Sequence, residues 1–267
     1  VYASNGTGFL EHDKLAKERP ERELALSSFP SPDELWKRYC TGKGIEKETE
    51  EKVTVPYYYE AGGAEPRYYQ RIAINRTVEA VTTGIYPGGI DKRILLVMAT
   101  GSGKTFTSFQ IIHRLREAGM AKRILYLADR NVLIDQTMKG DFKPFSKVMT
   151  KDVGKKMDSA FEVYMSLYQQ QVAENEEDDT YKQFAPGFFD LIIVDEAHEG
   201  TKTELGEAVM KELTKEQTKI LRLSGTPFNL FDDYKEDEIY TWDYVMEQRA
   251  KAEWDLTHFG DPNPYAG

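Results

Sequence analysis

Four short runs of branched apolar residues constrain the fold of this chain more than any other feature of its sequence. They cover residues 93–98, 123–128, 190–194 and 219–223, with a further mixed run at 161–167. Because polar residues do not alternate along them, they are typical of parallel strands covered on both faces. Amphipathic stretches lie between them, such as residues 105–118 before Gly119. This alternation predicts a doubly wound parallel α/β sheet, whose ligands bind at the carboxyl ends of the strands.

The overall composition excludes several classes of protein. The 267 residues include 35 Lys and Arg against 45 Asp and Glu, and the net charge of −10 excludes a generally basic nucleic-acid binder but not a local basic groove. The single cysteine, Cys40, excludes an internal disulfide scaffold and indicates a reducing, cytoplasmic compartment. The longest apolar run, residues 94–99, is far shorter than the roughly 20 residues of a membrane helix, so we expect no membrane partner. The chain begins with Val1, and we expect it to be a piece of something longer.

The distribution of polar and apolar residues divides the chain into three segments. Residues 1–65 are polar and predict a connecting segment with a helix near 32–40, because Ser31, Pro32 and Glu34 form a capping-box pattern. Residues 66–230 contain the apolar runs and predict an α/β domain that opens with a helix over 67–81. Residues 231–267 predict an acidic connection followed by a helix over 240–254. We expect the charged runs to be solvated faces or loops; they are residues 46–52, 174–179 and 232–238.

A glycine-rich loop follows the first apolar run. It reads Thr100-Gly101-Ser102-Gly103-Lys104-Thr105 and leads directly into a helical stretch. Gly101 and Gly103 let the backbone curl so that successive N–H groups and the positive end of the helix dipole can face a triphosphate. Lys104 would contact the β- and γ-phosphates, and the Thr105 hydroxyl would be a ligand of Mg²⁺. This pattern usually opens with glycine where the chain has Met98, and the alternative is a glycine-rich turn without a ligand.

Acidic and hydroxyl-bearing residues follow two later apolar runs. Asp195 would hold Mg²⁺ through water and Glu196 would be the general base for the attacking water, with a solvated acidic turn as the alternative. His198 has no cysteine or second histidine at metal-ligand spacing, which argues against zinc, so we expect it to form a coupling hydrogen bond. Ser224 and Thr226 form either a plain turn or a switch between the acidic box and a further domain.

Together these three motifs resemble those of superfamily 2 helicases and translocases. The segment TGSGKT at residues 100–105 resembles motif I, DEAH at 195–198 resembles motif II, and SGTP at 224–227 resembles motif III. The resemblance covers about residues 67–227, and the ordered set is specific although each motif alone is not. It implies a RecA-like P-loop NTPase fold and the first motor domain of a two-domain core, with residues 231–267 leading toward the second.

Further residues resemble the motor subunit, R, of type I restriction enzymes. Arg67 and Gln70 resemble the Q motif, in which the glutamine hydrogen-bonds the adenine edge, although a plain helix start is the alternative. Asp129 and Arg130 are similar to motif Ia of that subunit. The segment that contains Ser166, Tyr168 and Gln169 resembles a later motif of the same family, which contacts nucleic acid. Residues 2–6 and 29–36 resemble the family's connection between nuclease and motor.

This resemblance also implies a reaction and its partners. A type I R subunit binds ATP and Mg²⁺ and translocates duplex DNA before cleavage, in a complex with methyltransferase and specificity subunits. DNA would be held by its backbone, and the candidate contacts include Arg130, Lys139, Lys143 and Lys147. Two departures from the family pattern, Glu199 and Gly225, leave open the motor of a type III restriction enzyme or a repair helicase. The non-enzymatic alternative is a nucleotide-gated interaction module.

Two functional elements of such enzymes are not recognisable in the sequence. Nothing after Pro227 resembles the arginine-bearing motif of a second motor domain, so we expect this piece to bind Mg·ATP modestly and to hydrolyse it hardly at all. Asp33, Glu50 and Lys52 mimic the spacing of a nuclease core, but they fall in a capping turn and a charge run. We therefore expect no nuclease site here, and the resemblance implies a nuclease before Val1.

Overall fold

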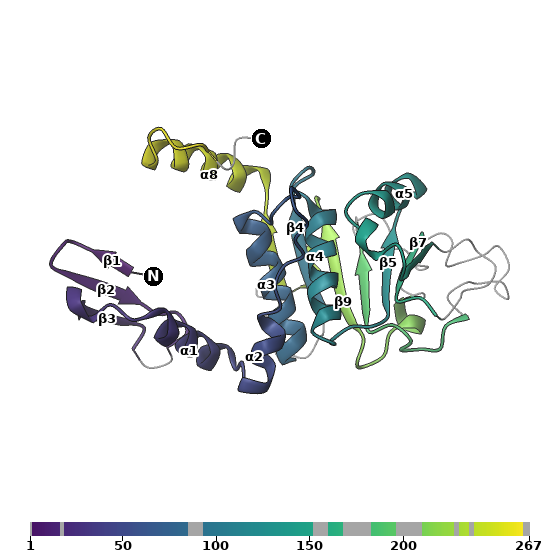
Figure 1. The fold of residues 1–267 in the computed structure, drawn as a ribbon, viewed down its shortest axis with the longest axis horizontal. Coiled ribbons are helices and arrows are strands. Elements are labelled where there is room, and N and C mark those ends of the chain that lie inside the picture. The colour runs from purple at the N-terminus through teal and green to yellow at the C-terminus, as the bar shows by residue number, and fades with distance from the viewer. Residues whose placement is uncertain are drawn as a thin grey trace. The chain divides into compact units, whose positions relative to one another are not determined.

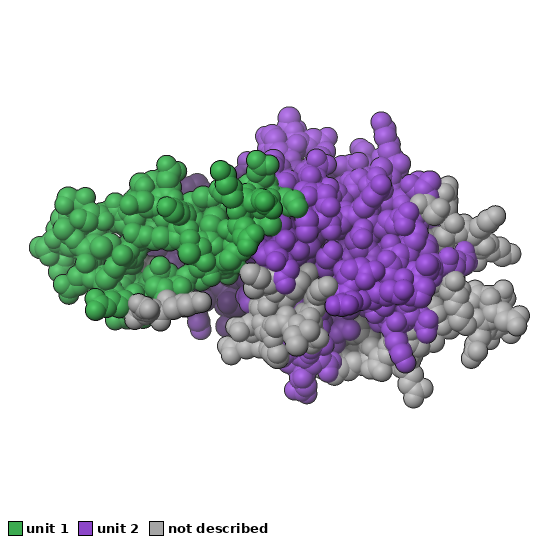
Figure 2. Space-filling view, turned by 90° about the horizontal axis from the view of Figure 1, so that it is seen from below, with its two compact units in different colours: residues 1–54 green, residues 55–267 purple. Residues whose placement is uncertain are grey.

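The structure is a computed structural model and describes residues 2–16, 19–84, 93–151, 160–167, 183–195, 210–226, 230–234 and 238–263. The chain forms two compact units, Val1–Thr54 and Val55–Gly267, which Figure 2 colours green and purple. Each unit has its own secondary structure and is described separately.

The first unit combines a small antiparallel sheet with two helices. Its strands are β1 (Tyr2–Ser4), β2 (Gly8–His12) and β3 (Glu21–Ala25), paired in that order, and a short 3-10 turn η1 (Leu26–Ser28) follows. Helix α1 (Pro32–Lys43) begins with the expected capping box, since Ser31 and Glu34 exchange side-chain and backbone hydrogen bonds. Helix α2 (Lys47–Val53) contains the charged run and buries only Val53, as expected for a solvated face.

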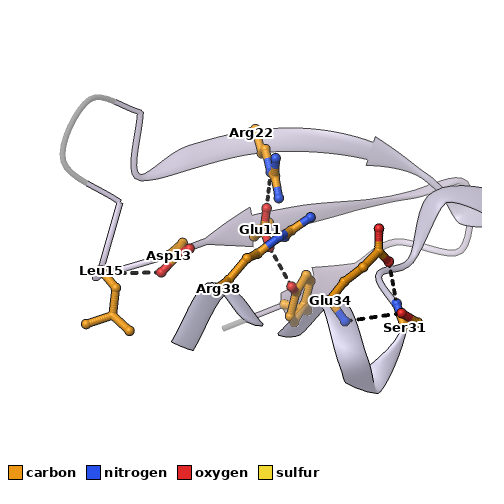
Figure 3. Close-up of polar contacts among 8 residues, drawn as sticks. Glu11, Asp13, Leu15, Arg22, Ser31, Glu34 and Arg38 are labelled. Atoms are coloured by element: carbon orange, nitrogen blue, oxygen red, sulfur yellow. Dashed lines mark hydrogen bonds and ion pairs between the residues drawn. The ribbon is translucent and has the colours of Figure 1, made fainter. Parts of the chain in front are cut away.

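A buried carboxylate joins the strands and the first helix of this unit. Glu11 of β2 is 2% exposed and accepts hydrogen bonds from Tyr2 of β1, Arg22 of β3 and Arg38 of α1. Figure 3 shows Arg22 and Arg38 approaching the Glu11 carboxylate from the sheet and from the helix. The hydrogen bond from Arg22 lowers the pKa of Glu11, outweighing the opposite effect of burial. The carboxylate is therefore held in its charged form and ties the unit together.

The second unit is built on a seven-stranded sheet in the order β10-β4-β9-β8-β5-β7-β6, in which all neighbouring strands are parallel. The strands are β4 (Arg93–Met98), β5 (Ile124–Ala128), β6 (Met149–Lys151), β7 (Val163–Leu167), β8 (Leu191–Val194), β9 (Lys219–Ser224) and β10 (Ile239–Trp242). The parallel sheet and its five expected strands are confirmed. The short edge strands β6 and β10 are additions that the apolar pattern did not reveal.

Helices and loops cover both faces of this sheet. In the described part of this unit, α3 (Tyr68–Thr83), α4 (Lys104–Glu117) and α5 (Asn131–Lys139) pack on the sheet, with 3-10 turns η2 (Lys143–Phe145) and η6 (Phe231–Asp233). Helix α8 (Tyr244–Thr257) follows β10 and contains no fully buried residue. Figure 1 shows α3 and α4 side by side next to β4. Their buried side chains, including Ile74, Phe109 and Ile112, form one core with the sheet. Tyr164, Phe189 and Leu213 belong to a second core, which includes Leu95 of β4.

The segment after β9 differs from the sequence-based expectation. The helix expected over 240–254 is wrong at its start, because residues 239–242 form β10 and α8 begins only at Tyr244, capped by Asp243. The acidic run 232–238 was expected to be solvated, but Glu238 is buried and its carboxylate lies 3.7 Å from Arg93 Nε. The other acidic run, 174–179, lies outside the described residues. Within the part of the chain that the structure describes, no helix is long and apolar enough to cross a membrane.

Candidate nucleotide-binding site

The glycine-rich loop (residues 99–103) connects the carboxyl end of β4 to the first turn of α4. Gly101 and Gly103 both have φ of +83°, the left-handed region in which a side chain is strained. A Cβ on Gly103 would also lie 2.5 Å from Gln70 Nε2. Both the backbone angle and this short contact therefore favour glycine at position 103. Because Gly103 is the N-cap of α4, the positive end of the helix dipole begins where the loop ends.

Lys104 and the segment after β9 meet at this loop. The Lys104 ammonium donates to the Met98 carbonyl across 3.4 Å. A Cβ on Gly225 would lie 3.4 Å from both Lys104 Nζ and Thr100 Oγ1. Since β9 is the direct neighbour of β4, the sheet topology brings these distant parts of the sequence together. Thr105 lies in the first turn of α4, directly after Lys104.

Two side chains of α3 hold the other side of the loop. The Ser102 carbonyl accepts hydrogen bonds from the Tyr69 hydroxyl at 3.1 Å and from Gln70 Nε2 at 2.9 Å. Gln70 Oε1 accepts from the Arg67 backbone N–H at 2.8 Å, so both ends of this buried amide are engaged within the protein. The adenine contact expected of Gln70 would use its second N–H and second lone pair. Arg67 is the N-cap residue of α3, immediately before the helix that carries Tyr69 and Gln70.

Asp195 follows β8 at the same edge of the sheet as the loop. Its backbone N–H donates to the Leu127 carbonyl, and its Oδ2 accepts from the Tyr126 hydroxyl at 2.6 Å. Tyr126 is fully buried in β5, so this hydrogen bond fixes the carboxylate from within the sheet. Sequence reasoning missed Tyr126, although a lone hydroxyl in the run 123–128 was an available signal because buried tyrosine hydroxyls usually have a partner. Glu196 and His198 lie outside the described residues.

Of the two residues expected to act as a switch, Ser224 is buried and Thr226 is exposed. Ser224 is fully buried at the end of β9, and its hydroxyl accepts from the Thr226 backbone N–H at 3.2 Å. Thr226 is the last residue described in this segment. The hydrogen bond closes a tight turn over residues 224–226, and Gly225 at its centre is the residue that approaches the glycine-rich loop.

The expected DNA contacts are spread over the carboxyl ends of β5 and β7. Arg130 has a side chain that is 73% exposed and pairs with Asp129, whose Oδ1 is buried and has no hydrogen-bond partner within the described part of the chain. Ser166 is fully buried inside β7, so its side chain does not reach the surface here. Tyr168 and Gln169 lie outside the described residues.

Two of the three lysines expected to contact DNA line a cavity, and the third ends α5. Lys143 and Lys147 line a cavity of about 530 Å³ together with aromatic side chains that include Tyr58 and Phe106. Asp141 lies in the same cavity, and burial raises the pKa of its carboxyl group. Lys139 is the last residue of α5 and does not line this cavity.

The donor set at the sheet edge fits a magnesium ion. Mg²⁺ prefers oxygen ligands and is commonly held by one or two carboxylates together with substrate phosphates. The Thr105 hydroxyl and the Asp195 carboxylate are oxygen ligands of this kind, and they follow β4 and β8 at the same edge of the sheet, with β9 between these strands. Among the described residues no cluster of three or more His, Cys, Asp or Glu could hold a metal by itself.

Comparison with known proteins identifies the family. The family described as "Type III restriction enzyme, res subunit" matches residues 63–229, which include the glycine-rich loop, Asp195 and the turn at Ser224. The chain belongs to this family. Its seven-stranded parallel sheet flanked by helices is similar to the RecA-like domains of superfamily 2 helicases, which confirms the fold expected from the motifs.

Two proteins with similar sequences are subunits of type I restriction enzymes. The chain is 42% identical to the Type I restriction enzyme EcoAI endonuclease subunit of Escherichia coli over 250 residues, which are 91% of this chain and 30% of that subunit. It is 30% identical to the EcoKI endonuclease subunit of Escherichia coli K12 over 190 residues, 66% of this chain and 15% of that subunit. These matches confirm the resemblance to type I R subunits, and the chain spans less than a third of either relative.

Solved structures lead to the same fold. A fragment of a putative HsdR subunit of a type I restriction enzyme from Vibrio vulnificus YJ016 is 32% identical with a TM-score of 0.65, covering 90% of this chain and 41% of that one. The Sulfolobus solfataricus SWI2/SNF2 ATPase core in complex with double-stranded DNA has a TM-score of 0.51 at 18% identity, over 68% of this chain and 36% of that one. At that identity the second match supports the fold alone.

Proposed function

We propose that this chain is the first motor domain of a type I restriction R subunit, which hydrolyses ATP to translocate duplex DNA before cleavage. The observation that carries the proposal is the approach of Gly225 to Lys104 and Thr100, because it joins the glycine-rich loop to the segment that follows the acidic box. The phosphate-binding loop and the Asp195 carboxylate follow β4 and β8, whose carboxyl ends lie at the same edge of the sheet with β9 between them, and phosphoryl transfer needs both kinds of group at one site. The identity to type I subunits supports the same reaction.

The proposed roles follow from the side chains at the sheet edge. The N–H groups of the glycine-rich loop and the N-terminus of α4 would bind the β- and γ-phosphates, and Lys104 would leave the Met98 carbonyl to pair with them. Mg²⁺ supplies charge neutralisation at these phosphates when it is bound. The Thr105 hydroxyl and the Asp195 carboxylate would hold it, with Tyr126 keeping the carboxylate oriented. Glu196 would accept the proton of the attacking water.

The proposed partners are duplex DNA and the methyltransferase and specificity subunits of a restriction complex. DNA would lie over the carboxyl ends of β5 and β7, where Arg130 is exposed and paired with Asp129. Such a contact would recognise the backbone phosphates rather than the bases, which suits a protein that moves along DNA. The net charge of −10 makes a local contact of this kind necessary.

The replacement Lys104→Ala in the full-length protein tests the proposal. We expect ATP to bind roughly 10- to 100-fold more weakly, because a charged hydrogen-bond donor is lost, and DNA-dependent hydrolysis to disappear. The control is Lys47→Ala, which removes an exposed lysine of α2 in the other unit. An unchanged rate would exclude the phosphate site. Nucleotide binding without any DNA-stimulated turnover in the full-length wild type would favour a nucleotide-gated interaction module instead.

A further inference from the structure

Strand β10 is bonded directly to the first residue of the glycine-rich loop. It lies at the edge of the sheet beside β4, with Trp242 in register with Met98. The Trp242 carbonyl accepts a hydrogen bond of 3.1 Å from the backbone N–H of Ala99. The segment that leads into α8 is therefore attached to the start of the loop by its main chain.

An aromatic stack attaches the same strand to the far side of the loop. Trp242 is 5% exposed, and its ring lies parallel to that of Tyr69, with centroids 4.6 Å apart and an interplanar angle of 6°. The ring of Tyr68 meets Trp242 edge-on at 5.2 Å. The hydroxyl of Tyr69 donates to the Ser102 carbonyl, so a continuous path runs from Trp242 through Tyr69 to Ser102.

A third contact fixes Tyr69 against β10. The Tyr240 hydroxyl donates to the Tyr69 backbone carbonyl at 2.8 Å. Burial raises the pKa of Tyr240 to about 12, so the hydroxyl keeps its proton at neutral pH and remains a donor. Asp243 follows Trp242 immediately and caps α8 by accepting from the Met246 N–H at 2.8 Å. The stack and the start of α8 are thus separated by one residue.

Hydrogen bonds between Ser102 and Ala99 close the loop, and nucleotide binding would change them. Both the backbone N–H and the hydroxyl of Ser102 donate to the Ala99 carbonyl, at 3.1 and 2.6 Å. A phosphate that accepts from the Ser102 N–H would compete with that carbonyl and shift the Ser102 peptide. Ala99 and Ser102 are the two loop residues held by β10, through the main chain and through Tyr69. A change at either end of the loop would therefore reach β10, from Ala99 through the main chain and from Ser102 through Tyr69.

We propose that Trp242 is a positioning residue of the nucleotide site, whose stack on Tyr69 sets the geometry of the loop and transmits its occupancy to α8. This inference rests on the proposed nucleotide binding and adds the route by which occupancy leaves the site. The indole N–H of Trp242 is buried and has no hydrogen-bond partner within the described residues. Trp242→Phe therefore removes no hydrogen bond while it keeps an aromatic ring, whereas Trp242→Leu removes the stack.

Nucleotide affinity and hydrogen exchange of the chain test the proposal together. We expect Trp242→Leu to bind Mg·ADP about 3- to 10-fold more weakly by calorimetry, and Trp242→Phe to stay within about twofold of wild type. Mg·ADP should slow exchange of amides in residues 240–250 of the wild type and the phenylalanine variant, and clearly less in the leucine variant, which keeps only the main-chain hydrogen bond to Ala99. Trp254→Leu is the matched control, since Trp254 lies later on α8 and stacks on His258.

A second variant covers the case in which Trp242→Leu does not fold. Tyr69→Phe keeps the stack but removes the hydroxyl that reaches the Ser102 carbonyl, so nucleotide should slow exchange over residues 240–250 clearly less than in the wild type. A full exchange response in this variant, or equal affinities of the wild type and Trp242→Leu, would overturn the inference. Failure of the wild type to bind Mg·ADP, or binding unaffected by Lys104→Ala, would instead overturn the proposed function.

Discussion

At the scale of single residues, two glycines of the loop form a matched pair. Gly101 and Gly103 have the same φ of +83°, but only at Gly103 would a Cβ meet a neighbour, at 2.5 Å from Gln70 Nε2. Alanine at either position adds backbone strain of about 1–2 kcal/mol. We expect Gly103→Ala to destabilise the protein by a further 1–3 kcal/mol or so, because the buried Gln70 amide loses the Ser102 carbonyl. Urea unfolding of both variants measures the difference, and equal losses would mean that Gln70 moves aside at no cost.

The hydrogen bond between Tyr126 and Asp195 gives a second prediction at this scale. Tyr126→Phe leaves the buried carboxylate without the donor that orients it, so we expect Mg²⁺-dependent ATP binding to weaken roughly tenfold. Binding without Mg²⁺ should change little, because the phenylalanine does not alter the loop. Tyr164→Phe is the control, since this tyrosine is also fully buried but its hydroxyl donates to the Phe161 carbonyl. Equal losses with and without Mg²⁺ would contradict a role at the metal.

Residue types at the site were predictable to the extent that they belong to a local pattern. The glycine-rich loop and Asp195 stand directly after apolar runs, so the parallel sheet was enough to predict that they share one edge. The partners Tyr126 and Gln70 depend instead on which strands and helices become neighbours in space. Strand order is not written in the periodicity of a single strand, so these contacts could not be derived from the sequence.

At the scale of elements, the segment after β9 shows how tertiary contacts override a local pattern. Residues 240–254 look helical in sequence, but β10 gains backbone hydrogen bonds from β4 and a stack on Tyr69. Asp243 was the available signal that the helix begins later, because its side chain caps α8. Glu238 is likewise buried against Arg93, whose guanidinium also lies over the Tyr234 ring at 4.8 Å. A charge run does not reveal such a partner.

The carboxylate that ties β1, β2, β3 and α1 together predicts a pH dependence for the first unit. The pKa of Glu11 is lower in the folded state because of Arg22, so its contribution to stability is present above the unfolded pKa of about 4.3 and is lost as pH falls through the folded value. We expect Glu11→Gln to cost about 1–3 kcal/mol at pH 7 and much less at pH 3, in urea unfolding followed by circular dichroism. The control is Glu23→Gln on the exposed face of β3. A loss that is the same at both pH values would exclude the ion pair as its cause.

At the scale of the whole molecule, the α/β unit was predictable, whereas in the first unit only the capped helix was, and the sheet was not. Runs such as residues 93–98 are buried on both faces and stand out from the polar sequence around them. Strands β1 and β3 contain no fully buried residue, so their sequences carry little hydrophobic contrast. They form a sheet through hydrogen bonds and through Glu11, which is a polar residue in an otherwise polar segment. Periodicity detects apolar cores and not sheets held in this way.

The last prediction concerns how much chemistry the 267-residue chain can perform alone. Its proposed site lies at one edge of a single RecA-like sheet, and no arginine-bearing motif is recognisable after residue 227. An arginine that stabilises the transition state contributes about 10³–10⁵ in rate, and enzymes commonly turn over at 1–10³ per second. We therefore expect the chain to bind Mg·ATP but to hydrolyse it at below about 10⁻² per second, with no stimulation by duplex DNA. The measurement is phosphate release with and without DNA, with Lys104→Ala as the background. Brisk DNA-stimulated turnover would show that residues of this chain already supply the missing charge, and would contradict the prediction.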